Sequence, residues 1–279
     1  MKLSIITINY NDVIGLERTI KSVLEQTASD YEYIIIDGNS TDGSKEIIAK
    51  YTHHFSYNSS EPDHGVYDAM NKGIKNATGD YLLFLNSGDT LFNPEVIEKV
   101  LPHLRSEHDL IYGDLYMVPT NQPSFKHTYP KSLDFTFFKQ TSLGHPATFI
   151  KKELFEKHGN YRTDLHIVSD WAFFLKVICV GQATYKKIDL VVSNFYEGGI
   201  STTANNKAKH KAEIKKVLLE HYGLYNSSFD ALLLTSQEND RIFGQVNPQL
   251  QLVTTNQYLL KILNKIIAFM AWILKKKRS

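Results

Sequence analysis

The N-terminal stretch Leu3-Ser4-Ile5-Ile6-Thr7-Ile8-Asn9-Tyr10-Asn11-Asp12 predicts a buried β-strand that leads directly into a helix. The run Leu3–Tyr10 is short, apolar and rich in isoleucine, as expected for a strand covered on both faces. Asn11 or Asp12 supplies a side-chain oxygen suited to cap a helix. In the residues that follow, apolar positions recur at helical spacing and predict one buried face. They are Val13, Leu16, Ile20, Val23 and Leu24.

The same alternation of strand and helix continues along the first hundred residues. Further apolar strands are predicted at Tyr33–Asp37 and Tyr81–Leu85, and further helices at Ser44–Lys50, Tyr67–Asn76 and Pro94–Leu101. Strands alternating with helices indicate a mainly parallel sheet, which binds its ligands beyond the carboxyl ends of the strands. The polar residues at these strand ends are therefore expected to share one rim. They are Asn9, Asn11, Asp37, Asn39, Asn86 and Asp89.

The composition is that of an ordinary globular chain of 279 residues, with 42% apolar and 22% charged residues. The 31 Lys and Arg nearly balance the 30 Asp and Glu, so no bulk basic charge favours a nucleic-acid partner. Cys179 is the single cysteine, which excludes an intrachain disulfide and a cysteine metal cluster. The N-terminal apolar run is too short for a signal peptide, and no apolar stretch reaches the roughly 18 residues of a membrane span.

The charge is unevenly distributed along the chain. Residues 241–279 hold seven basic and no acidic residues, which leaves 24 basic and 30 acidic residues in 1–240. Within 256–279, a broad apolar surface with one tryptophan is followed by the basic cluster Lys275–Arg278. This pattern favours a helix lying on an anionic membrane surface. Docking on the rest of the chain and a dimer helix are the alternatives.

Further helices and loops are predicted in the second half of the chain. A helix with one apolar face is predicted at Asp170–Cys179, a loop at Gly198–Ser201 that could close over a ligand, and a charged amphipathic helix at Lys207–His221, closed by Gly223. Residues 225–250 are polar and weakly patterned, as in a linker.

Motif searches exclude several nucleotide-binding and hydrolytic classes. No G-x-G-x-x-G follows the first strand, and Ser44 puts Lys45 out of register for a P-loop. The turn Asn86-Ser87-Gly88-Asp89, which follows a buried strand directly, is more informative. Mg²⁺ and Mn²⁺ prefer oxygen ligands and need only one or two carboxylates plus substrate phosphates. Asp89 offers the carboxylate, and Gly88 leaves room for a phosphate.

Five motifs in order resemble the nucleotide-sugar domain of inverting family-two glycosyltransferases, which have the α/β GT-A fold. They are residues 4–11 (Ser-Ile-Ile-Thr-Ile-Asn-Tyr-Asn), 36–44 (Ile-Asp-Gly-Asn-Ser-Thr-Asp-Gly-Ser), 61–73 (Glu-Pro-Asp-His-Gly-Val-Tyr-Asp-Ala-Met-Asn-Lys-Gly), 77–81 (Ala-Thr-Gly-Asp-Tyr) and 84–89 (Phe-Leu-Asn-Ser-Gly-Asp). The resemblance covers about residues 3–205. It implies a nucleotide-sugar-binding half at 1–115, an acceptor-binding half of the same domain at 116–205, and a C-terminal helical extension at 206–279.

The resemblance also implies roles for individual residues on the donor side. The base pocket would be lined by Thr7 and Asn9, with Asp37 accepting hydrogen bonds from the base or ribose and Asp63 reading the base edge. The residues near the nucleotide would be Asp68, Asn71 and Lys72. Asp89 would bind Mg²⁺ or Mn²⁺, with Asn86 as an oxygen donor directly or through water. The family often has acids where this chain has Asn86 and Gly88.

The second half supplies the candidate base. Asp170 lies in an acid-aromatic segment of the kind that holds the base in the family, although its position alone also suits a helix N-cap. His145 lies where acceptor-side residues occur, and a buried structural histidine is the alternative. A carboxylate base is needed because the attacking hydroxyl must lose its proton. A metal offsets the charge that develops on the leaving diphosphate.

We therefore expect an inverting, metal-dependent glycosyltransferase that moves a hexose or N-acetylhexosamine from a UDP-sugar to a saccharide or lipid-linked saccharide in surface polysaccharide synthesis. The expected location is the cytoplasm, at the inner face of the cell membrane, with contact through 256–279. A nucleotidyltransferase is one alternative, although Ile8–Gly15 lacks the glycine-rich basic loop of that class. A non-catalytic saccharide-binding or scaffold protein of the same fold is the other.

Overall fold

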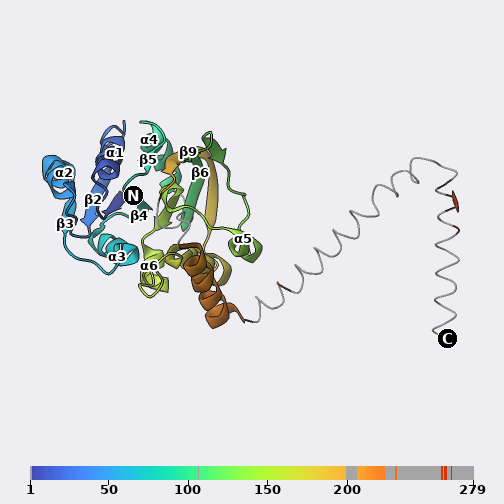
Figure 1. Cartoon of the computed structure of the whole chain (residues 1–279). Helices are drawn as coiled ribbons and strands as arrows, with labels where there is room; N and C mark the ends of the chain where they lie inside the picture. Colours follow the sequence, from blue (N-terminus) through green and yellow to red (C-terminus); the bar gives the residue numbers. More distant parts are fainter. Residues whose placement is uncertain are drawn as a thin grey trace. The chain divides into compact units, whose positions relative to one another are not determined.

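The computed structural model describes residues 2–105, 107–198 and 206–223, together with the single residues 230, 259, 261, 262 and 265 (Figure 1). Contacts divide the chain into two compact units, Met1–Val217 and Leu218–Ser279. The expected linker at 225–250 and the expected membrane-binding segment at 256–279 lie almost entirely outside the described residues. No helix in the described ranges is both long enough and apolar enough to cross a membrane.

The first unit is built on one sheet, which is parallel in its first half, as the alternation of elements predicts, and mixed in its second half. Its strands are β1 (Leu3–Asn9), β2 (Tyr31–Asp37), β3 (Tyr57–Ser60), β4 (Tyr81–Phe84), β5 (Thr90–Leu91), β6 (Leu110–Val118), β7 (Phe125–His127), β8 (Thr148–Lys151) and β9 (Tyr185–Tyr196). The strand order is β3-β2-β1-β4-β8-β6-β9-β5, and β7 pairs with β6. The neighbours β3 and β2, β2 and β1, and β1 and β4 are parallel, and β6 runs parallel to β9.

Helices flank the sheet (Figure 1). They are α1 (Val13–Leu24), α2 (Ser44–Tyr51), α3 (Val66–Asn76), α4 (Val96–Leu104), α5 (Phe135–Gln140), α6 (Glu153–His158) and α7 (Ser169–Leu175), with 3₁₀ turns η1 (Thr52–His54) and η2 (His145–Ala147) and the π-helical turn η3 (Lys176–Val180). Residues 207–223 form a further helix.

The core forms where the sequence places its apolar runs. Every residue of β1 is buried, and α3 packs on β1 and β2. The approach of α3 is close at Gly73, where a β-carbon would lie 2.5 Å from Ile6 Cγ2. Asp12 caps α1, its side chain accepting from Gly15 N, which confirms the cap prediction.

Two predicted helix boundaries were wrong. The helix expected at Pro94–Leu101 is α4, which begins at Val96 and continues through Pro102. Gln26 Oε1 accepts from Ile97 N at 3.0 Å, so a side chain just after α1 satisfies an amide at the start of α4. The helix expected at Asp170–Cys179 begins one residue earlier as α7 and continues as the π-helical turn η3.

The antiparallel strand β8 positions the site. It pairs with β4, Leu83 opposite Phe149, and with β6, Ile111 opposite Phe149. Because β8 runs in reverse, its first residue lies at the same edge as the carboxyl ends of β1, β2 and β4. The turn η2, which contains His145 and precedes β8 directly, is therefore delivered to the rim where the polar strand ends lie.

Candidate active site

The ends of β1 and β2 form a dense polar junction. Asn9 lies opposite Asp37 in the parallel register, and its amide donates to Asp37 Oδ1 at 2.7 Å. The Asp37 carboxylate is fully buried and also accepts from Ser40 N at 2.9 Å, Ser40 Oγ at 2.5 Å and Ser60 Oγ at 2.5 Å. Burial alone would raise the pKa of Asp37, but hydrogen bonds from Ser40, Ser60 and Asn9 outweigh it and lower the pKa below 3.8.

Thr7 lies beneath this junction. Its hydroxyl donates to Leu85 O at 2.7 Å and lies 3.0 Å from the hydroxyl of Tyr33, so it links β1 with the ends of its two neighbours. Ser87 Oγ donates to Asn9 Oδ1 at 2.8 Å and connects the turn after β4 to the same network. In the structure, Thr7 and Asn9 therefore bind other parts of the rim.

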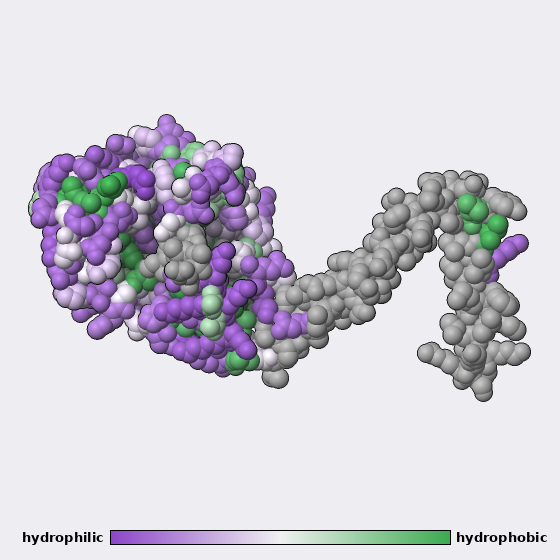
Figure 2. Space-filling view, in the orientation of Figure 1, coloured by the Kyte–Doolittle hydropathy of each residue, from purple (hydrophilic) through white to green (hydrophobic). Residues whose placement is uncertain are grey.

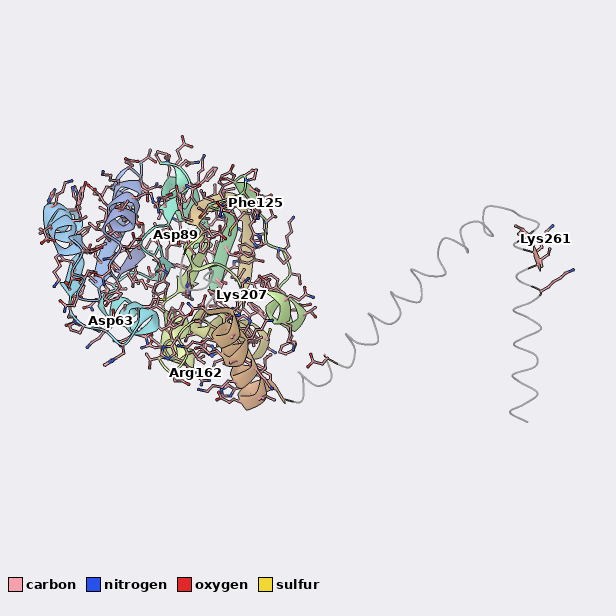
Figure 3. All side chains as sticks on the ribbon, viewed as in Figure 1. Asp63, Asp89, Phe125, Arg162, Lys207 and Lys261 are labelled. Carbon is pink, nitrogen blue, oxygen red and sulfur yellow. The ribbon has the colours of Figure 1, made fainter. Side chains whose placement is uncertain are left out.

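Asp63 lies beside the end of β2, in the turn that leads to α3. A β-carbon on Gly38 would lie 2.6 Å from Asp63 Oδ2 and 3.0 Å from the Tyr10 ring, so these three residues meet at the rim. Tyr10 is 68% exposed and presents an open aromatic face there. Asp63 Oδ1 accepts from Gly65 N at 2.9 Å, which fixes the turn. Figure 3 shows Asp63 beside α3.

The predicted residues of α3 point to different partners. Asp68 accepts from His64 N at 3.0 Å. Lys72 Nζ donates to Pro62 O at 2.9 Å and lies 3.8 Å from Asp68, so both hold the loop at the helix start. Asn71 faces the second half instead: its amide donates to Tyr161 O at 2.9 Å and accepts from Tyr161 N at 3.1 Å.

The turn after β4 holds a second buried carboxylate, Asp89, whose pKa is raised where that of Asp37 is lowered. Asp89 is 7% exposed, and its Oδ1 accepts from Tyr196 N at 3.2 Å. Burial raises the pKa of Asp89 to about 7, although the Tyr196 amide and the charge of Arg18 act against it. The Arg18 guanidinium lies 3.9 Å above the Tyr196 ring. Gly88 has φ of 100°, a left-handed conformation that favours glycine, and it makes the turn sharp.

The residues of this turn fit a divalent cation with few protein ligands. Asn86 Oδ1 is buried and has no hydrogen-bond partner among the described residues. An orphaned amide oxygen and an under-partnered buried carboxylate are oxygen ligands of the kind Mg²⁺ and Mn²⁺ take, alongside waters and phosphates. In the described ranges, no group of three or more His, Cys, Asp or Glu is gathered as for a metal held by protein alone.

Asp170 lies in the first turn of α7, and Val168, not Asp170, is the N-cap residue. The alternative interpretation of Asp170 as an N-cap was therefore wrong. Asp170 Oδ1 lies 2.6 Å from the Tyr67 hydroxyl of α3. Asp170 Oδ2 lies 3.6 Å from His145 Nδ1, and the Asp170 side chain is 21% exposed. The fold therefore brings the carboxylate from the second half against the helix that carries the third motif.

His145 is buried between this carboxylate and an aromatic cluster. Its Nε2 lies 3.1 Å from the Tyr161 hydroxyl, and its ring lies 5.5 Å from the ring of Phe84. Burial lowers the pKa of His145 below 6.5, although the charge of Asp170 acts against this. A neutral imidazole at neutral pH follows.

Three residues that support the site escaped the sequence analysis. Tyr67 contacts Asp170, Arg18 faces Asp89, and Glu213 holds the loop before α7. Glu213, in the helix at 207–223, accepts from His166 N and Ile167 N, each at 2.9 Å. Tyr67 lies inside a quoted motif next to Asp68, so its position was available as a signal. Nothing in the local pattern marks Glu213.

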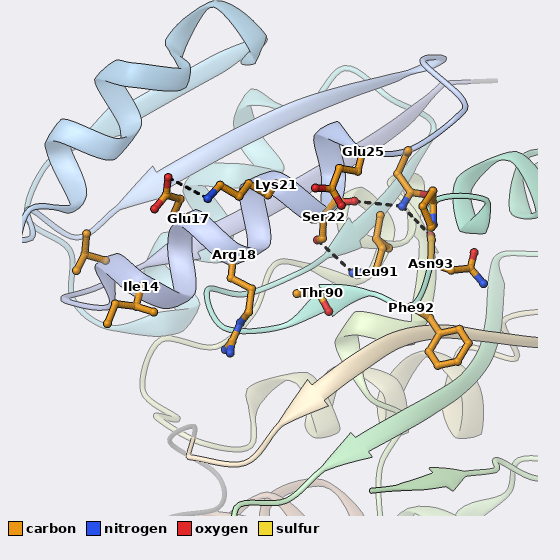
Figure 4. A pocket seen from close by; sticks show the side chains of 13 residues that line it. Ile14, Glu17, Arg18, Lys21, Ser22, Glu25, Thr90, Leu91, Phe92 and Asn93 are labelled. Carbon is orange, nitrogen blue, oxygen red and sulfur yellow. Dashed lines mark hydrogen bonds and ion pairs between the residues drawn. The ribbon is translucent and has the colours of Figure 1, made fainter.

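A groove of about 610 Å³ lies between α1 and residues 90–94 (Figure 4). Ile14, Arg18 and Phe92 are among its lining residues, and Glu17 and Lys21 form an ion pair on its wall at 3.3 Å. Asp37, Asp63 and Asp170 do not line it. Figure 2 shows a mainly hydrophilic surface on the visible face of the first unit, interrupted by small apolar patches.

The sheet, its flanking helices and the polar strand ends gathered at one edge define an α/β fold of the GT-A type. The family model "Glycosyl transferase family 2" matches residues 4–159, and the chain belongs to this family. The resemblance and the fold class inferred from the sequence are thereby confirmed.

Curated relatives carry glycosyltransferase names. A "PGL/p-HBAD biosynthesis glycosyltransferase" of Mycobacterium bovis is 32% identical over 211 residues, which are 73% of this chain and 80% of the relative. A glycosyltransferase of Haemophilus influenzae is 30% identical over 234 residues, 79% of this chain and 76% of the relative.

Solved structures share the fold. TarS residues 1–349 of S. aureus, in complex with UDP-GlcNAc, superposes with a TM-score of 0.60 at 19% identity, covering 73% of this chain and 61% of that one. The mannosyltransferase PcManGT of Pyrobaculum calidifontis, in complex with GDP-Man and Mn²⁺, gives 0.53 at 14% identity, covering 69% and 56%. This chain thus spans less than two thirds of these solved chains.

Proposed function

We propose that this glycosyltransferase moves a hexose or N-acetylhexosamine from a UDP-sugar to a saccharide or lipid-linked saccharide, with inversion at the anomeric carbon. One observation carries the proposal: the Asp170 carboxylate of the second half lies 2.6 Å from Tyr67 of α3, the helix of the nucleotide-sugar motif. A candidate base therefore lies beside the donor-side residues, at the edge of the sheet where ligands bind.

The donor is bound in the first half, residues 1–115. The nucleobase of the donor lies near the exposed ring of Tyr10 and the carboxylate of Asp63, which meet over Gly38. Asp37, Thr7 and Asn9 hold this rim in place, and Asp68 and Lys72 fix the loop between Asp63 and α3. Support for the donor class comes from TarS, a neighbour of the same fold whose structure contains UDP-GlcNAc.

Asp89 and Asn86 hold Mg²⁺ or Mn²⁺ in this proposal. The bound cation offsets the negative charge that develops on the leaving diphosphate. The fit rests on the buried Asp89 carboxylate and the unpartnered Asn86 Oδ1. PcManGT, which shares the fold, has Mn²⁺ in its structure.

Asp170 acts as the general base in residues 116–205, the acceptor-binding half. It takes the proton of the acceptor hydroxyl as that oxygen attacks the anomeric carbon and the sugar–phosphate bond breaks on the opposite face. A single displacement of this kind inverts the anomeric centre. Neutral His145, whose Nδ1 lies 3.6 Å from Asp170 Oδ2, lies on the acceptor side.

We place the activity at the inner face of the cell membrane, in surface polysaccharide synthesis. The basis is the sequence of 256–279 within the extension 206–279, where an apolar surface meets a basic cluster.

The test is transfer and donor hydrolysis with Mn²⁺ or Mg²⁺ across a panel of nucleotide sugars, for wild type, Asp89→Ala and Asp170→Asn. We expect UDP release from wild type, a large loss in both variants, and donor binding retained in Asp170→Asn. Equal rates in all three proteins would overturn the mechanism, and release of pyrophosphate would identify a nucleotidyltransferase. Donor binding without turnover across the panel would identify a binding protein.

A further inference from the structure

Tyr67 lies between the candidate base and the backbone that leads into α7. Its side chain is 5% exposed, and its ring packs 5.6 Å from the ring of Tyr161. Its hydroxyl lies 2.6 Å from Asp170 Oδ1 and 2.7 Å from Ile167 O. Both distances are those of strong hydrogen bonds between oxygen atoms.

The two contacts compete for one hydrogen. A tyrosine hydroxyl has a single proton to donate, and an ionised carboxylate and a carbonyl are both acceptors only. While Asp170 is charged, its oxygen is the stronger acceptor and takes the Tyr67 hydrogen. Once Asp170 is protonated, its pull on that hydrogen weakens, and the hydrogen can turn to Ile167 O.

Tyr67 retains its proton throughout. Burial raises the pKa of Tyr67 well above 10, and the charge of Asp170 raises it further. The other groups that face Asp170 are His145, whose pKa is lowered by burial, and Tyr161 and Tyr129, whose pKa values are raised by burial and by Asp170. These three groups are neutral at neutral pH, so Tyr67 is a neutral donor among neutral neighbours.

The second acceptor is held in place. Ile167 O belongs to the loop before α7, and Glu213 accepts from the amides of His166 and Ile167 on the same loop. Glu213 is 7% exposed, so the hydrogen bonds are shielded from water. The loop is therefore fixed by Tyr67 from α3 and by Glu213 from the helix at 207–223.

We propose that Tyr67 is a positioning residue for Asp170, fixing Oδ1 so that Oδ2 is left for the acceptor hydroxyl; this rests on the proposed function. In the reaction, the acceptor oxygen forms the new bond to the anomeric carbon and its proton passes to Asp170. The sugar–phosphate bond breaks, and its electron pair leaves with the diphosphate. The Tyr67 hydrogen then turns from Asp170 toward Ile167 O, and no proton leaves Tyr67.

The first experiment compares Tyr67→Phe with Tyr112→Phe in the full chain. Tyr112 is also fully buried, but its hydroxyl donates to the backbone carbonyl of Pro130 at 2.7 Å. We expect Tyr67→Phe to lower kcat about 10- to 100-fold, the effect of losing a hydrogen bond to a charged group. We expect its donor KM to stay within about twofold of wild type, because the base acts after the donor binds. A kcat equal to that of Tyr112→Phe would overturn the proposal.

The second experiment is a double-mutant cycle with Asp170→Asn. Because Tyr67 acts through Asp170, adding Tyr67→Phe to Asp170→Asn should change kcat by less than about twofold. Multiplied losses would show that Tyr67 acts on structure alone and would overturn the proposal. If Asp170→Asn keeps wild-type kcat, the proposed base is wrong. If Asp170→Asn is inactive but Tyr67→Phe is not, only the role of Tyr67 is wrong.

Thermal unfolding and binding of UDP with Mn²⁺ establish that each variant is folded. If Tyr67→Phe does not fold, Tyr67→Met replaces it, because its long apolar side chain fills much of the same space and likewise has no hydroxyl to donate. A kcat at least about tenfold below that of Tyr112→Phe, with UDP binding intact, then supports the proposal. A kcat equal to that of Tyr112→Phe overturns it.

Discussion

The ends of β2 and β4 each bring a buried carboxylate to the same edge of the sheet, but the two carboxylates have opposite character. Asp37 is surrounded by donors from Asn9, Ser40 and Ser60, and its pKa is lowered. Asp89 accepts from Tyr196 N at 3.2 Å, and burial raises its pKa to about 7. The comparison shows that the fold itself satisfies Asp37 but leaves Asp89 under-partnered, which makes Asp89 the better candidate for holding a ligand.

The largest expected effect comes from Asp89→Asn, which removes the charge proposed to hold the cation. We expect transfer activity to fall about a thousandfold, because charge stabilisation at the leaving group is lost. UDP release with Mn²⁺ measures it. The control is Asp189→Asn, since the Asp189 side chain is 91% exposed and should not matter. Unchanged activity in Asp89→Asn would break the comparison between the two carboxylates.

The same substitution should stabilise the metal-free protein at alkaline pH. The pKa of Asp89 rises from 3.8 to about 7 on folding, so the folded state binds the extra proton and stability falls as pH rises between these values. The shift corresponds to at most about 4 kcal/mol. Asp89→Asn should therefore unfold later than wild type at pH 8 and equally at pH 4. Urea unfolding in EDTA at both pH values is the measurement, and no gain at pH 8 would contradict the prediction.

Mn²⁺ should reduce the stability advantage of Asp89→Asn over wild type. At a concentration about 100 times its dissociation constant, Mn²⁺ bound to the folded state alone adds about 2.7 kcal/mol to wild type. Asp89→Asn should gain much less. Thermal unfolding with and without Mn²⁺ at pH 8 tests this, and equal shifts in both proteins would place the cation elsewhere.

Asp37→Asn should be less stable than wild type at neutral pH, in contrast to Asp89→Asn. An asparagine keeps one acceptor oxygen but presents an amide to donors from Ser40 and Ser60, at a cost of about 2 kcal/mol. Because folding lowers the pKa of Asp37, its contribution is fully present above pH about 4 and decreases as the pH falls from there through the lowered pKa. Urea unfolding should show a smaller difference from wild type at pH 3 than at pH 7. A gain in stability at pH 7 would be the contrary result.

Glu213→Gln should have the smallest effect. The amide still offers one acceptor oxygen to His166 and Ile167, so the loop before α7 loses one of two hydrogen bonds. We expect a loss of about 1 kcal/mol and a decrease in kcat of a few fold, with donor KM unchanged. Lys215→Ala, an exposed position on the same helix, is the control. An altered donor KM would mean that Glu213 serves the donor rim.

Much of this fold could be predicted from local patterns. The alternation of buried strands and amphipathic helices before residue 101 gave β1, β2, β4 and α1–α3 with boundaries within about two residues. The polar strand ends gave the rim, because parallel strands all place their carboxyl ends at one edge. Asp37 and Asp89 were therefore identified from the strand pattern, and Asp63 from the family resemblance.

What the sequence could not predict depends on contacts between distant residues. Whether Asp37 or Asp89 is satisfied is decided by donors such as Ser60 and Tyr196, which no local pattern connects to them. Asn71 was expected near the nucleotide, yet its amide binds the backbone of Tyr161, 90 residues away. The start of α4 lies two residues later than predicted, where Gln26, just after α1, satisfies Ile97 N.

The Glu213 contact sets a practical boundary for recombinant work. The family match ends at residue 159, and the motifs alone would suggest cutting the chain near residue 205. Such a fragment would lose the acceptor for two backbone amides just before the helix that carries Asp170. Expression trials should extend at least to Tyr222, which is itself buried, or a shortened enzyme will be judged inactive for a reason unrelated to its chemistry.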